Sequence, residues 1–233
     1  MSDLIMSLSE VMRAELDSLN SIAHNTSNST TVGYRSQRTV LDGTAFAERL
    51  NGNSDASLLK QRLSSANGAL NITGQATDMA VRGSGWFKVR TETGFAITRN
   101  GNFKVSEQGF LVTQEGHIVQ TDQGDFLVPT QRWTLAANGN VIVEGAVFAQ
   151  LAIVEAPATE EVQALGKHLY RAARLEMANA NNVVVQGALE GANVDMAGDM
   201  VRLMEATRHI ETLQRSMSAY DQLLNTGINQ LGK

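Results

Sequence analysis

The spacing of apolar residues changes twice along this chain of 233 residues, and that change most limits its fold. Apolar residues recur every three or four positions from Asp3 to about Ala23 and again from Asp195 to Leu231, as in amphipathic helices. Between Met79 and Val154 they fall in short runs bounded by turn residues, which indicates β-strands. The sequence therefore predicts a helix on each side of an all-β region.

The predicted fold class is α+β. A helix of this kind draws most of its stability from burying its apolar face, so both apolar stripes need a partner. We expect the N- and C-terminal amphipathic helices to pack as a coiled-coil-like helical domain, with an inserted all-β domain of short antiparallel strands. The predicted domains are a terminal helical domain at 1–28 and 190–233, a polar connector at 29–76, an all-β domain at 77–170 and a return connector at 171–189.

Local signals refine these elements. Residues 24–76 are rich in Ser, Asn and Thr, whose side chains bond the nearby backbone, so we expect loops and extended segments there. The pairs Asn100-Gly101 and Asn138-Gly139 favour the positive φ angles of type I′ hairpins. Asn193 is the expected N-cap of the second helix. Glu211 and Arg215, one turn apart on it, predict an ion pair.

Composition removes several classes of function. The net charge of -5 gives no electrostatic reason to expect a nucleic-acid partner. The absence of cysteine excludes disulfides, thiolate nucleophiles and Cys-ligated zinc. Because the first basic residue is Arg13, we expect no cleavable signal peptide. The least charged stretch, 133–154, contains Glu144 and alternates like strands, so we expect no membrane insertion.

Motifs for catalysis and cofactor binding are missing. The four histidines are far apart in the chain and have no metal-ligand spacing. Gly83-Ser84-Gly85 begins like a dinucleotide fingerprint, but Lys88 stands where the third glycine belongs and a strand follows instead of a helix. No GxSxG elbow is present. The sequence predicts no enzyme, no cofactor, no metal site and no small-molecule substrate.

Aromatic residues leave one alternative open. Five of them, at positions 86, 87, 95, 103 and 110, could form a stacking platform for sugars or bases. Their alternation along predicted strands favours a place in the β core instead. The alternative function is therefore a binding module whose β domain stands on a helical oligomerisation stem.

Four stretches together carry a resemblance to a known family. They are NSTTVGYRSQR from Asn28, MAVRGSGWFKV from Met79, GFAITRNGNFKVSEQGFLVTQEGHIVQ from Gly94, and VVVQGALEGANVDMAGDMVRLMEATRHIETLQRSM from Val183. In this order, over nearly the whole chain, they resemble the bacterial flagellar rod and hook protein family. Val32 departs from the Thr or Pro common in that family. Within it, the single compact β domain is most similar to the proximal rod proteins.

The resemblance implies a structural subunit of the flagellar basal-body rod, which polymerises through its terminal helices into the drive shaft that transmits motor torque. Implied partners are copies of itself, other flagellar rod proteins and the flagellar export apparatus. The implied location is the periplasm-spanning rod, reached by type III export without a cleaved signal peptide. Another axial paralogue, of distal rod or hook type, is the nearest alternative.

The expected assembly interface combines the helix stripes with the two family signatures. Gly33 is expected to allow a tight chain reversal, and Tyr34 to anchor that turn against a neighbouring subunit. The interface residues are Leu8, Met12, Leu19, Asn28, Thr31, Gly33, Tyr34, Gln186, Gly187, Leu189, Glu190, Asn193, Val194, Val201, Met204, Leu213, Met217, Tyr220 and Leu224.

Overall fold

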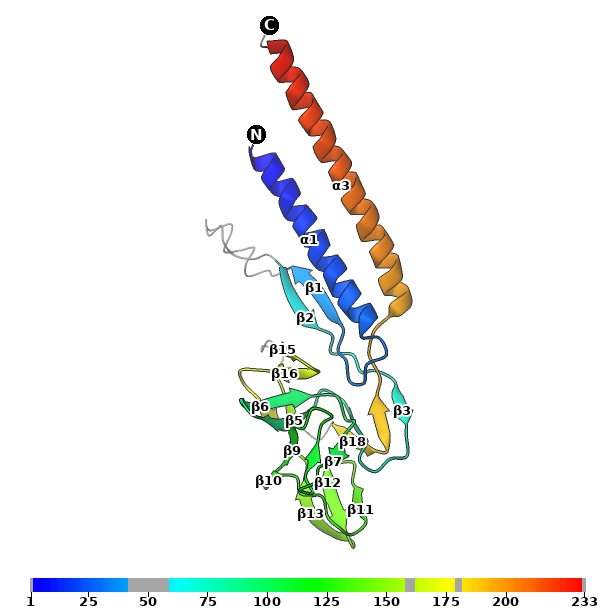
Figure 1. Cartoon of the computed structure of the whole chain (residues 1–233). Coiled ribbons are helices and arrows are strands. Elements are labelled where there is room, and N and C mark those ends of the chain that lie inside the picture. The colour runs from blue at the N-terminus through cyan, green and yellow to red at the C-terminus, as the bar shows by residue number, and fades with distance from the viewer. Residues whose placement is uncertain (1, 42–58, 158–161, 179–181, 232–233) are drawn as a thin grey trace. The chain divides into compact units, whose positions relative to one another are not determined.

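The computed structural model describes residues 2–41, 59–157, 162–178 and 182–231 (Figure 1). The chain divides into two compact units. The helical unit comprises Met1–Ser27, Gln37–Arg62 and Asp195–Lys233, and the β unit comprises Asn28–Ser36 and Leu63–Val194. The chain therefore passes between the units four times, at positions 27/28, 36/37, 62/63 and 194/195.

The helical unit contains two helices and a small sheet. Helix α1 (Ser2–Ser27) and helix α3 (Met196–Leu231) lie side by side and run in opposite directions (Figure 1). Strands β1 (Gln37–Leu41) and β2 (Leu59–Leu63) form a two-stranded sheet, and β1 packs against α1. The two helix faces that meet are mostly half-buried, so their packing leaves much apolar surface open to solvent.

One asparagine joins helix α1 to strand β1. The Asn25 side chain donates from Nδ2 to the Gln37 carbonyl at 2.9 Å and accepts from the Gln37 amide through Oδ1 at 2.8 Å. Asn25 is buried, so these bonds satisfy both backbone groups of Gln37 as a neighbouring strand would. The C-terminal end of α1 is thus hydrogen-bonded to the first residue of β1.

Helix α3 begins differently from the prediction. The Asp195 carboxylate accepts the Gly198 amide at 3.1 Å, so Asp195 is the N-cap. Asn193 is not the cap, because its side chain bonds to backbone groups of the β unit. The expected pair of Glu211 and Arg215 is present at 3.9 Å.

The β unit is made of short strands. They are β3 (Leu70–Ile72), β4 (Met79–Arg82), β5 (Trp86–Thr91), β6 (Gly94–Thr98), β7 (Lys104–Val105), β8 (Leu111–Val112), β9 (Ile118–Thr121), β10 (Gly124–Asp125), β11 (Trp133–Leu135), β12 (Asn140–Val143), β13 (Ala146–Gln150), β14 (Ile153–Glu155), β15 (Gln163–Gly166), β16 (Leu169–Arg171), β17 (Glu176–Met177), β18 (Val183–Gln186) and β19 (Ala188–Glu190).

These strands form antiparallel sheets. The largest has ten strands, with the central order β15-β16-β6-β5-β9-β8-β7, and β10, β14 and β17 attached beside it. A three-stranded sheet follows the order β11-β12-β13. Two pairs join strands far apart in sequence: β4 with β18, and β3 with β19. The strands that end the β unit therefore pair with those that precede its hairpins.

The type I′ turns are not where the sequence predicts them, since neither Asn100-Gly101 nor Asn138-Gly139 has positive φ angles at both residues. Gly101 has no positive φ angle, so the predicted type I′ turn at Asn100-Gly101 is wrong. Gly101 is needed for space instead, since a Cβ there would lie 1.5 Å from the Met79 carbonyl oxygen. Type I′ geometry occurs at Glu144-Gly145, between β12 and β13, and at Lys167-His168, between β15 and β16.

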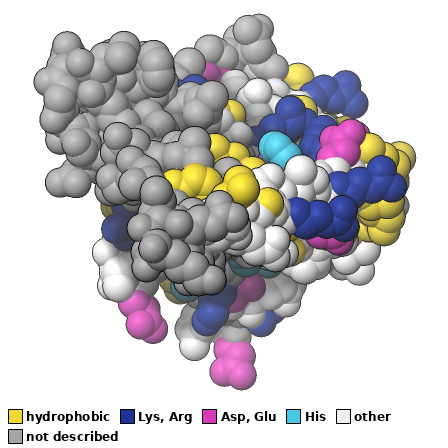
Figure 2. Space-filling view, turned by 90° about the horizontal axis from the view of Figure 1, so that it is seen from above, with side chains coloured by type: hydrophobic (Ala, Val, Ile, Leu, Met, Phe, Trp, Pro, Cys, Tyr) yellow, Lys and Arg dark blue, Asp and Glu magenta, His cyan; other side chains and the backbone are white. Residues whose placement is uncertain are grey.

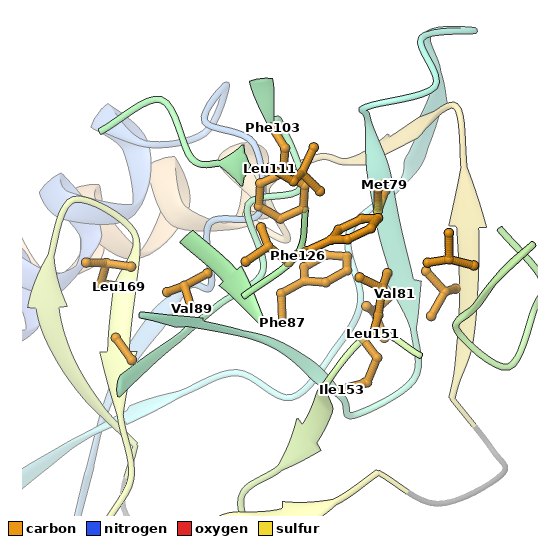
Figure 3. Close-up of a cluster of buried hydrophobic side chains, with 14 residues drawn as sticks. Met79, Val81, Phe87, Val89, Phe103, Leu111, Phe126, Leu151, Ile153 and Leu169 are labelled. Carbon is orange, nitrogen blue, oxygen red and sulfur yellow. The ribbon is translucent and has the colours of Figure 1, made fainter. Parts of the chain in front are cut away.

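The core of the β unit lies on one face of the central sheet (Figure 3). Phe87 and Val89 on β5 and Ala96 on β6 point into it, and Phe87 meets Phe103 edge to face with ring centroids 5.2 Å apart. Trp86 and Ile97, the alternate residues of the same strands, belong to a second buried cluster with Val154 and Tyr170. Both faces of β5 and β6 are therefore covered.

The predicted fold class, a coiled-coil-like helical domain carrying an all-β insert, is wrong. The described residues form one helix at each end and a large β-rich body whose strands extend from Gln37 to Glu190. Residues 37–41, 59–63 and 70–72 of the predicted polar connector form strands, because their backbone groups find partners in β1–β2 and β3–β19. The apolar residues of α3 do not form one seam, since Val201 and Met204 are exposed whereas Leu213 and Met217 are half-buried.

Candidate functional site

Three distant segments of the chain meet at one end of the β unit. The first is Asn28–Ser36, within the N-terminal signature 28–38, and the last is 186–194, within the C-terminal signature 183–217. The Gly33 amide donates to the Glu190 carbonyl at 2.7 Å, and the Asn193 amide donates to the Tyr34 carbonyl at 3.3 Å. The Ser36 amide donates to Asn193 Oδ1 at 2.6 Å. The backbones of the two signatures are thus hydrogen-bonded side by side.

The third segment is 64–68, where the chain returns to the β unit. The Gly68 amide donates to Glu190 Oε1 at 2.9 Å, and Asn193 Nδ2 donates to the Ala66 carbonyl at 2.6 Å. The Ser64 amide donates to the Ser36 carbonyl at 2.8 Å. Glu190 and Asn193 therefore each bind both of the other segments.

A buried ionic cluster lies at the centre of this meeting point. The Glu190 carboxylate lies 3.3 Å from Arg35 Nη2 through Oε1 and 3.3 Å from Arg99 Nη1 through Oε2. Each of the three side chains is only 2% exposed. We call the site formed by Gly33, Arg35, Gly68, Arg99, Glu190 and Asn193 the junction.

Backbone carbonyls complete the arginine hydrogen bonds. Arg35 also donates to the Ala66 carbonyl and to Asn67 Oδ1. Arg99 donates to the Val81 carbonyl at 2.9 Å and to the Gly83 carbonyl at 2.5 Å. Each guanidinium thereby ties its own segment to a neighbouring strand or loop.

Trp86 provides the remaining contact for both arginines. The guanidinium carbons of Arg99 and Arg35 lie 5.2 Å and 5.8 Å from its ring centroid. The Nε–H groups of both arginines are buried and have no hydrogen-bond partner among the described residues. The electron-rich face of the indole compensates part of that deficit through cation–π attraction.

Burial sets the electrostatics of the junction. The pKa of Arg99 is lowered to about 10, first by burial and then by the nearby charge of Arg35, while the Glu190 carboxylate opposes both. Burial also lowers the pKa of Arg35, again against Glu190. Burial raises the pKa of Tyr170, against a hydrogen bond from the Arg35 backbone and the Arg35 charge. Both arginines stay protonated at neutral pH, so two cations share one carboxylate.

Glycines allow the segments to approach so closely. Gly33 has a φ angle of +67°, and a Cβ there would lie 2.4 Å from the backbone of Arg99. A Cβ on Gly68 would lie 1.9 Å from the Gly191 carbonyl oxygen. Any side chain at either position would push the junction apart.

The start of the C-terminal signature is tied into the β unit by Gln186. Its side chain accepts the Leu135 amide at 2.9 Å and donates to the Ala76 carbonyl at 2.9 Å. The Gly187 carbonyl accepts the amides of Thr73 and Gly74, and its own amide donates to Asp78. This segment therefore links residues 73–78, which precede β4, to strand β11.

The structure divides the predicted interface residues into separate groups. The signature residues gather around the junction and its flanks: Asn28, Thr31, Gly33, Tyr34, Gln186, Gly187, Leu189, Glu190, Asn193 and Val194. Tyr34 is 7% exposed, so its side chain is already packed within one chain, and its role as an anchor against a neighbour stays a prediction.

The helix residues of the prediction lie in the helical unit. Met12, Leu19, Leu213, Met217 and Tyr220 are half-buried, whereas Val201 and Met204 are exposed. The side chains of Leu8 and Leu224 lie outside the described residues.

Arg35, Arg99 and Trp86 are functional residues that the sequence prediction missed. Arg35 follows Tyr34 inside the N-terminal signature, and that position could have identified it as a junction residue. Arg99 and Trp86 read as ordinary strand residues, and no periodicity links them to Glu190. Three of the aromatic residues considered for a stacking platform, Trp86, Phe87 and Phe103, are buried in the β unit, as the core interpretation predicts.

The junction consists of two guanidinium groups, one carboxylate and the backbone groups that they bind. It places no nucleophilic side chain beside a general base. Within 2–41, 59–157, 162–178 and 182–231, no group of three or more His, Asp or Glu residues is arranged to hold a metal ion. In the same ranges no helix is long and apolar enough to cross a membrane. The arrangement can hold three distant segments of the β unit together, which is a mechanical capacity.

Two family models match the chain in the regions just described. Residues 80–149 match the model described as "Flagellar hook protein FlgE/F/G D1 domain". Residues 185–231 match the model described as "Flagellar basal body rod FlgEFG protein C-terminal". The first covers the central β unit, and the second starts just before the junction and continues along α3.

Curated relatives extend over almost the full length. The flagellar basal-body rod protein FlgF of Rhizobium meliloti (strain 1021) is 31% identical, covering 98% of this chain and 97% of the relative. FlgF of Caulobacter vibrioides is 27% identical over 95% of this chain and 94% of its own. The rod protein FlgG of Bacillus subtilis (strain 168) is 26% identical over 91% and 92%. The chain therefore belongs to the flagellar basal-body rod protein family, whose members are structural proteins of the flagellum.

Proposed function

We propose that the chain is a FlgF-like structural subunit of the basal-body rod that polymerises through its terminal helices. Subunits that present one face to a different face of the next make contacts that do not close on themselves, and such contacts generate a helical filament. The assembled filament is the drive shaft, and its partners are copies of this chain and other rod proteins. The proximal part of the rod is the proposed position.

The observation that carries this proposal is the exposed apolar surface of α3. Large apolar side chains on its first turns are 40–55% exposed, and they are Met196, Met200, Val201, Leu203 and Met204. Figure 2 shows hydrophobic side chains beside Lys and Arg side chains on the described surface. Contiguous exposed apolar groups rimmed by charge are typical of interaction sites.

The opposite face of the same helix is already occupied. Ala206 is buried, and Ile210, Leu213, Met217 and Tyr220 are half-buried at spacings of three and four along α3. This face supports the pairing of α1 with α3 inside one subunit. The exposed methionine-rich face remains for a neighbour, and methionine adapts well to several partners because its side chain is flexible.

The signature residues take a supporting part in this proposal. Those around the junction are mostly buried or half-buried, so they act by holding the segments of the β unit together. The exposed helix residues Val201 and Met204 make the direct contacts. We propose these two, with Met200, as the centre of the interface.

The test is complementation of a strain that lacks the gene. Met200→Ser combined with Met204→Ser should give rods that stop short in electron micrographs of isolated basal bodies, because the variant subunit folds but does not stack. Gln214→Ser, at an exposed polar position of the same helix, is the matched control and should restore full rods. Full rods and normal swimming with the double variant would remove the proposed interface.

We also propose that the subunit reaches the periplasm-spanning rod through the flagellar type III export apparatus without loss of an N-terminal segment. Family membership supports this step. Mass spectrometry of the subunit from purified basal bodies tests it, and a cleaved N-terminus would contradict it.

The binding-module alternative loses its main support in the β unit. Of the aromatic residues that were to form a platform, only Phe95 is largely exposed, and Lys88 Nζ already lies 4.2 Å from its ring centroid. A single capped ring offers little stacking surface to a sugar or base.

A further inference from the structure

We propose that Glu190 acts as a completion latch: the N-terminal signature 28–36 becomes fixed only after the C-terminal segment 186–194 has packed against it. The inference concerns the order in which one chain becomes rigid. It does not depend on the proposed assembly, because every contact involved lies within the β unit of a single chain.

The first argument is charge. Arg35 and Arg99 lie on opposite sides of one carboxylate, and the Arg35 charge acts against the Arg99 charge. Glu155 also attracts Arg99, but its influence is the smallest of those acting on that residue. Before Glu190 arrives, burying both guanidiniums would place two like charges in a water-poor site with little compensation. Arg35 therefore stays in solvent until then, and its segment stays open.

The second argument is the destination of the backbone hydrogen bonds. The Gly33 amide donates to the Glu190 carbonyl, and the Gly68 amide donates to the Glu190 carboxylate. The Ser36 amide donates to the side chain of Asn193. These three amides lie in the segments 28–36 and 64–68. All their acceptors lie in 186–194, which is the last of the three segments in the sequence.

The third argument is loop closure. The bond from Ser36 to Asn193 spans 157 residues, and that from Gly68 to Glu190 spans 122. Strands β5 and β6 instead pair Thr91 with Gly94 across a two-residue turn and continue to Phe87 and Thr98. Contacts that close long loops form after local ones, because their entropic cost must be met first. The hairpin can therefore form without the junction, and the junction cannot form without the end of the β unit.

The sharpest test uses the unaltered full chain. Refolding from denaturant is followed by pulsed hydrogen exchange with NMR detection of single amides. The amides of Gly33, Ser36 and Gly68 should gain protection together, in a phase at least about tenfold slower than the amides of Val89 and Ile97 in the hairpin. Protection of the junction amides in the same phase as the hairpin, or before it, would overturn the latch.

A variant separates the charge from the shape of the latch. Glu190→Gln keeps the size of the side chain and an acceptor for the Gly68 amide but removes the negative charge. In the native state, the amides of Gly33 and Ser36 should exchange roughly 100-fold faster, while those of Val89 and Ile97 keep their rates. Glu115→Gln, at an exposed turn position, is the control and should leave all these rates unchanged.

Two results of the variant experiment would count against the proposal. Unchanged exchange at Gly33 and Ser36 in Glu190→Gln would show that the carboxylate does not hold the signature. Equal acceleration of the junction and the hairpin would show that Glu190 supports the whole unit and has no separate latch role. If the variant does not fold, the refolding experiment on the unaltered chain still decides the question.

Discussion

The two units of this chain satisfy their apolar residues in opposite ways. In the β unit, Phe87 and Val89 are 1% and 0% exposed, and even the charges of the junction are buried and paired. In the helical unit, Met200 and Met204 are 52% and 55% exposed on a regular helix. The β unit has a closed core within a single chain, although Ile72, Val147 and Met177 at its surface are exposed, and we propose that the helical unit covers its exposed face with a neighbour.

This contrast suggests a division of tasks inside one subunit. A unit with a closed core keeps its shape whether or not the rod is assembled. A unit with an exposed apolar face gains further burial on association, so we propose that its contacts carry the assembly. Variants that change one unit at a time test whether the two units lose stability independently.

The largest effect is expected in the β core. Phe87→Ala removes a ring that is almost fully buried against Phe103, and it should lower the free energy of unfolding of the β unit by about 3–5 kcal/mol. Both tryptophans, Trp86 and Trp133, lie in the β unit, so tryptophan fluorescence in a urea titration reports on it alone. Phe95→Ala, at an exposed position, should cost less than about 1 kcal/mol. Similar losses for both variants would mean that the core is not closed.

The junction gives a prediction of unequal losses. Glu190→Gln leaves two buried cations without a counter-ion and should lower the free energy of local opening of the junction, read from hydrogen exchange of the Gly33 and Ser36 amides, by about 3 kcal/mol. Arg99→Met leaves Glu190 paired with Arg35 and should lower it by only about 1–2 kcal/mol, for the lost hydrogen bonds to Val81 and Gly83. Arg90→Met, which breaks an exposed pair, should change it by under about 1 kcal/mol in the same exchange measurement. Equal losses at Glu190 and Arg99 would contradict the shared-carboxylate description.

A smaller change is expected at the contact between α1 and β1. Asn25→Ala leaves both buried backbone groups of Gln37 without their side-chain partner and should cost the helical unit about 1–3 kcal/mol. Thermal unfolding followed by far-UV circular dichroism measures this loss. Asn20→Ala, on the exposed side of the same helix, is the control. A matching shift in tryptophan fluorescence would show that the units do not unfold separately.

Alkaline pH tests the β unit through Tyr170. Burial raises the pKa of Tyr170, so the folded chain keeps a phenol proton that the unfolded chain loses above pH of about 10. The stability that Tyr170 contributes is therefore present below that pH and is lost as pH rises through the folded pKa. The lowered pKa of Arg99, about 10, acts in the opposite direction over the same range, because the folded chain releases that proton first.

Tyr170→Phe isolates the tyrosine part of this pH dependence. The loss of stability between about pH 8 and about pH 10.5 should be smaller in this variant than in the unaltered chain in urea titrations. Tyr220→Phe, in the helical unit, is the comparison and should leave the fluorescence-detected slope unchanged. A slope unaffected by Tyr170→Phe would mean that the phenol titrates as it does in the unfolded chain.

The smallest change in monomer stability is expected on the exposed face of α3, which is the proposed centre of the assembly interface. Met204→Ser removes an exposed side chain and should change the stability of the helical unit by less than about 0.5 kcal/mol. Sedimentation velocity should show weaker self-association than that of the unaltered chain. A loss of more than about 1 kcal/mol in the monomer would show that this face is covered within one subunit, which would remove the contrast between the units.

Elements with a regular period could be predicted from the sequence. The spacing of apolar residues identified both helices and most strands. Of the aromatic core candidates, Trp86, Phe87 and Phe103 are buried as expected, whereas Phe95 is 51% exposed. Periodicity could not select the face of α3 that meets α1, because its apolar stripe is wide. Val201 and Met204 fit the spacing as well as Leu213 and Met217, and only the second pair is half-buried in the monomer.

The junction could be predicted only in part, for a different physical reason. The signatures pointed to Gly33, Glu190 and Asn193, but the role of Arg99 depends on contacts between segments far apart in the chain, and no local pattern encodes these. The two type I′ turns at Glu144-Gly145 and Lys167-His168 were missed because their residues are uncommon at such turns. The Asn-Gly pairs, which favour that turn in isolation, adopt other conformations here.

The four chain crossings also limit how such a protein can change over evolutionary time. A gene segment that encodes Leu63–Val194 carries Arg99 and Glu190 but leaves Arg35 behind, since the first piece of the β unit is encoded before β1. A single exchange of that segment between paralogues would join a carboxylate from one lineage to an arginine from another. Hairpins far from the junction, such as β12–β13, are free of that linkage and can lengthen or diverge alone. Diversity among related proteins should therefore accumulate in the hairpins, while the residues that close the junction are inherited together.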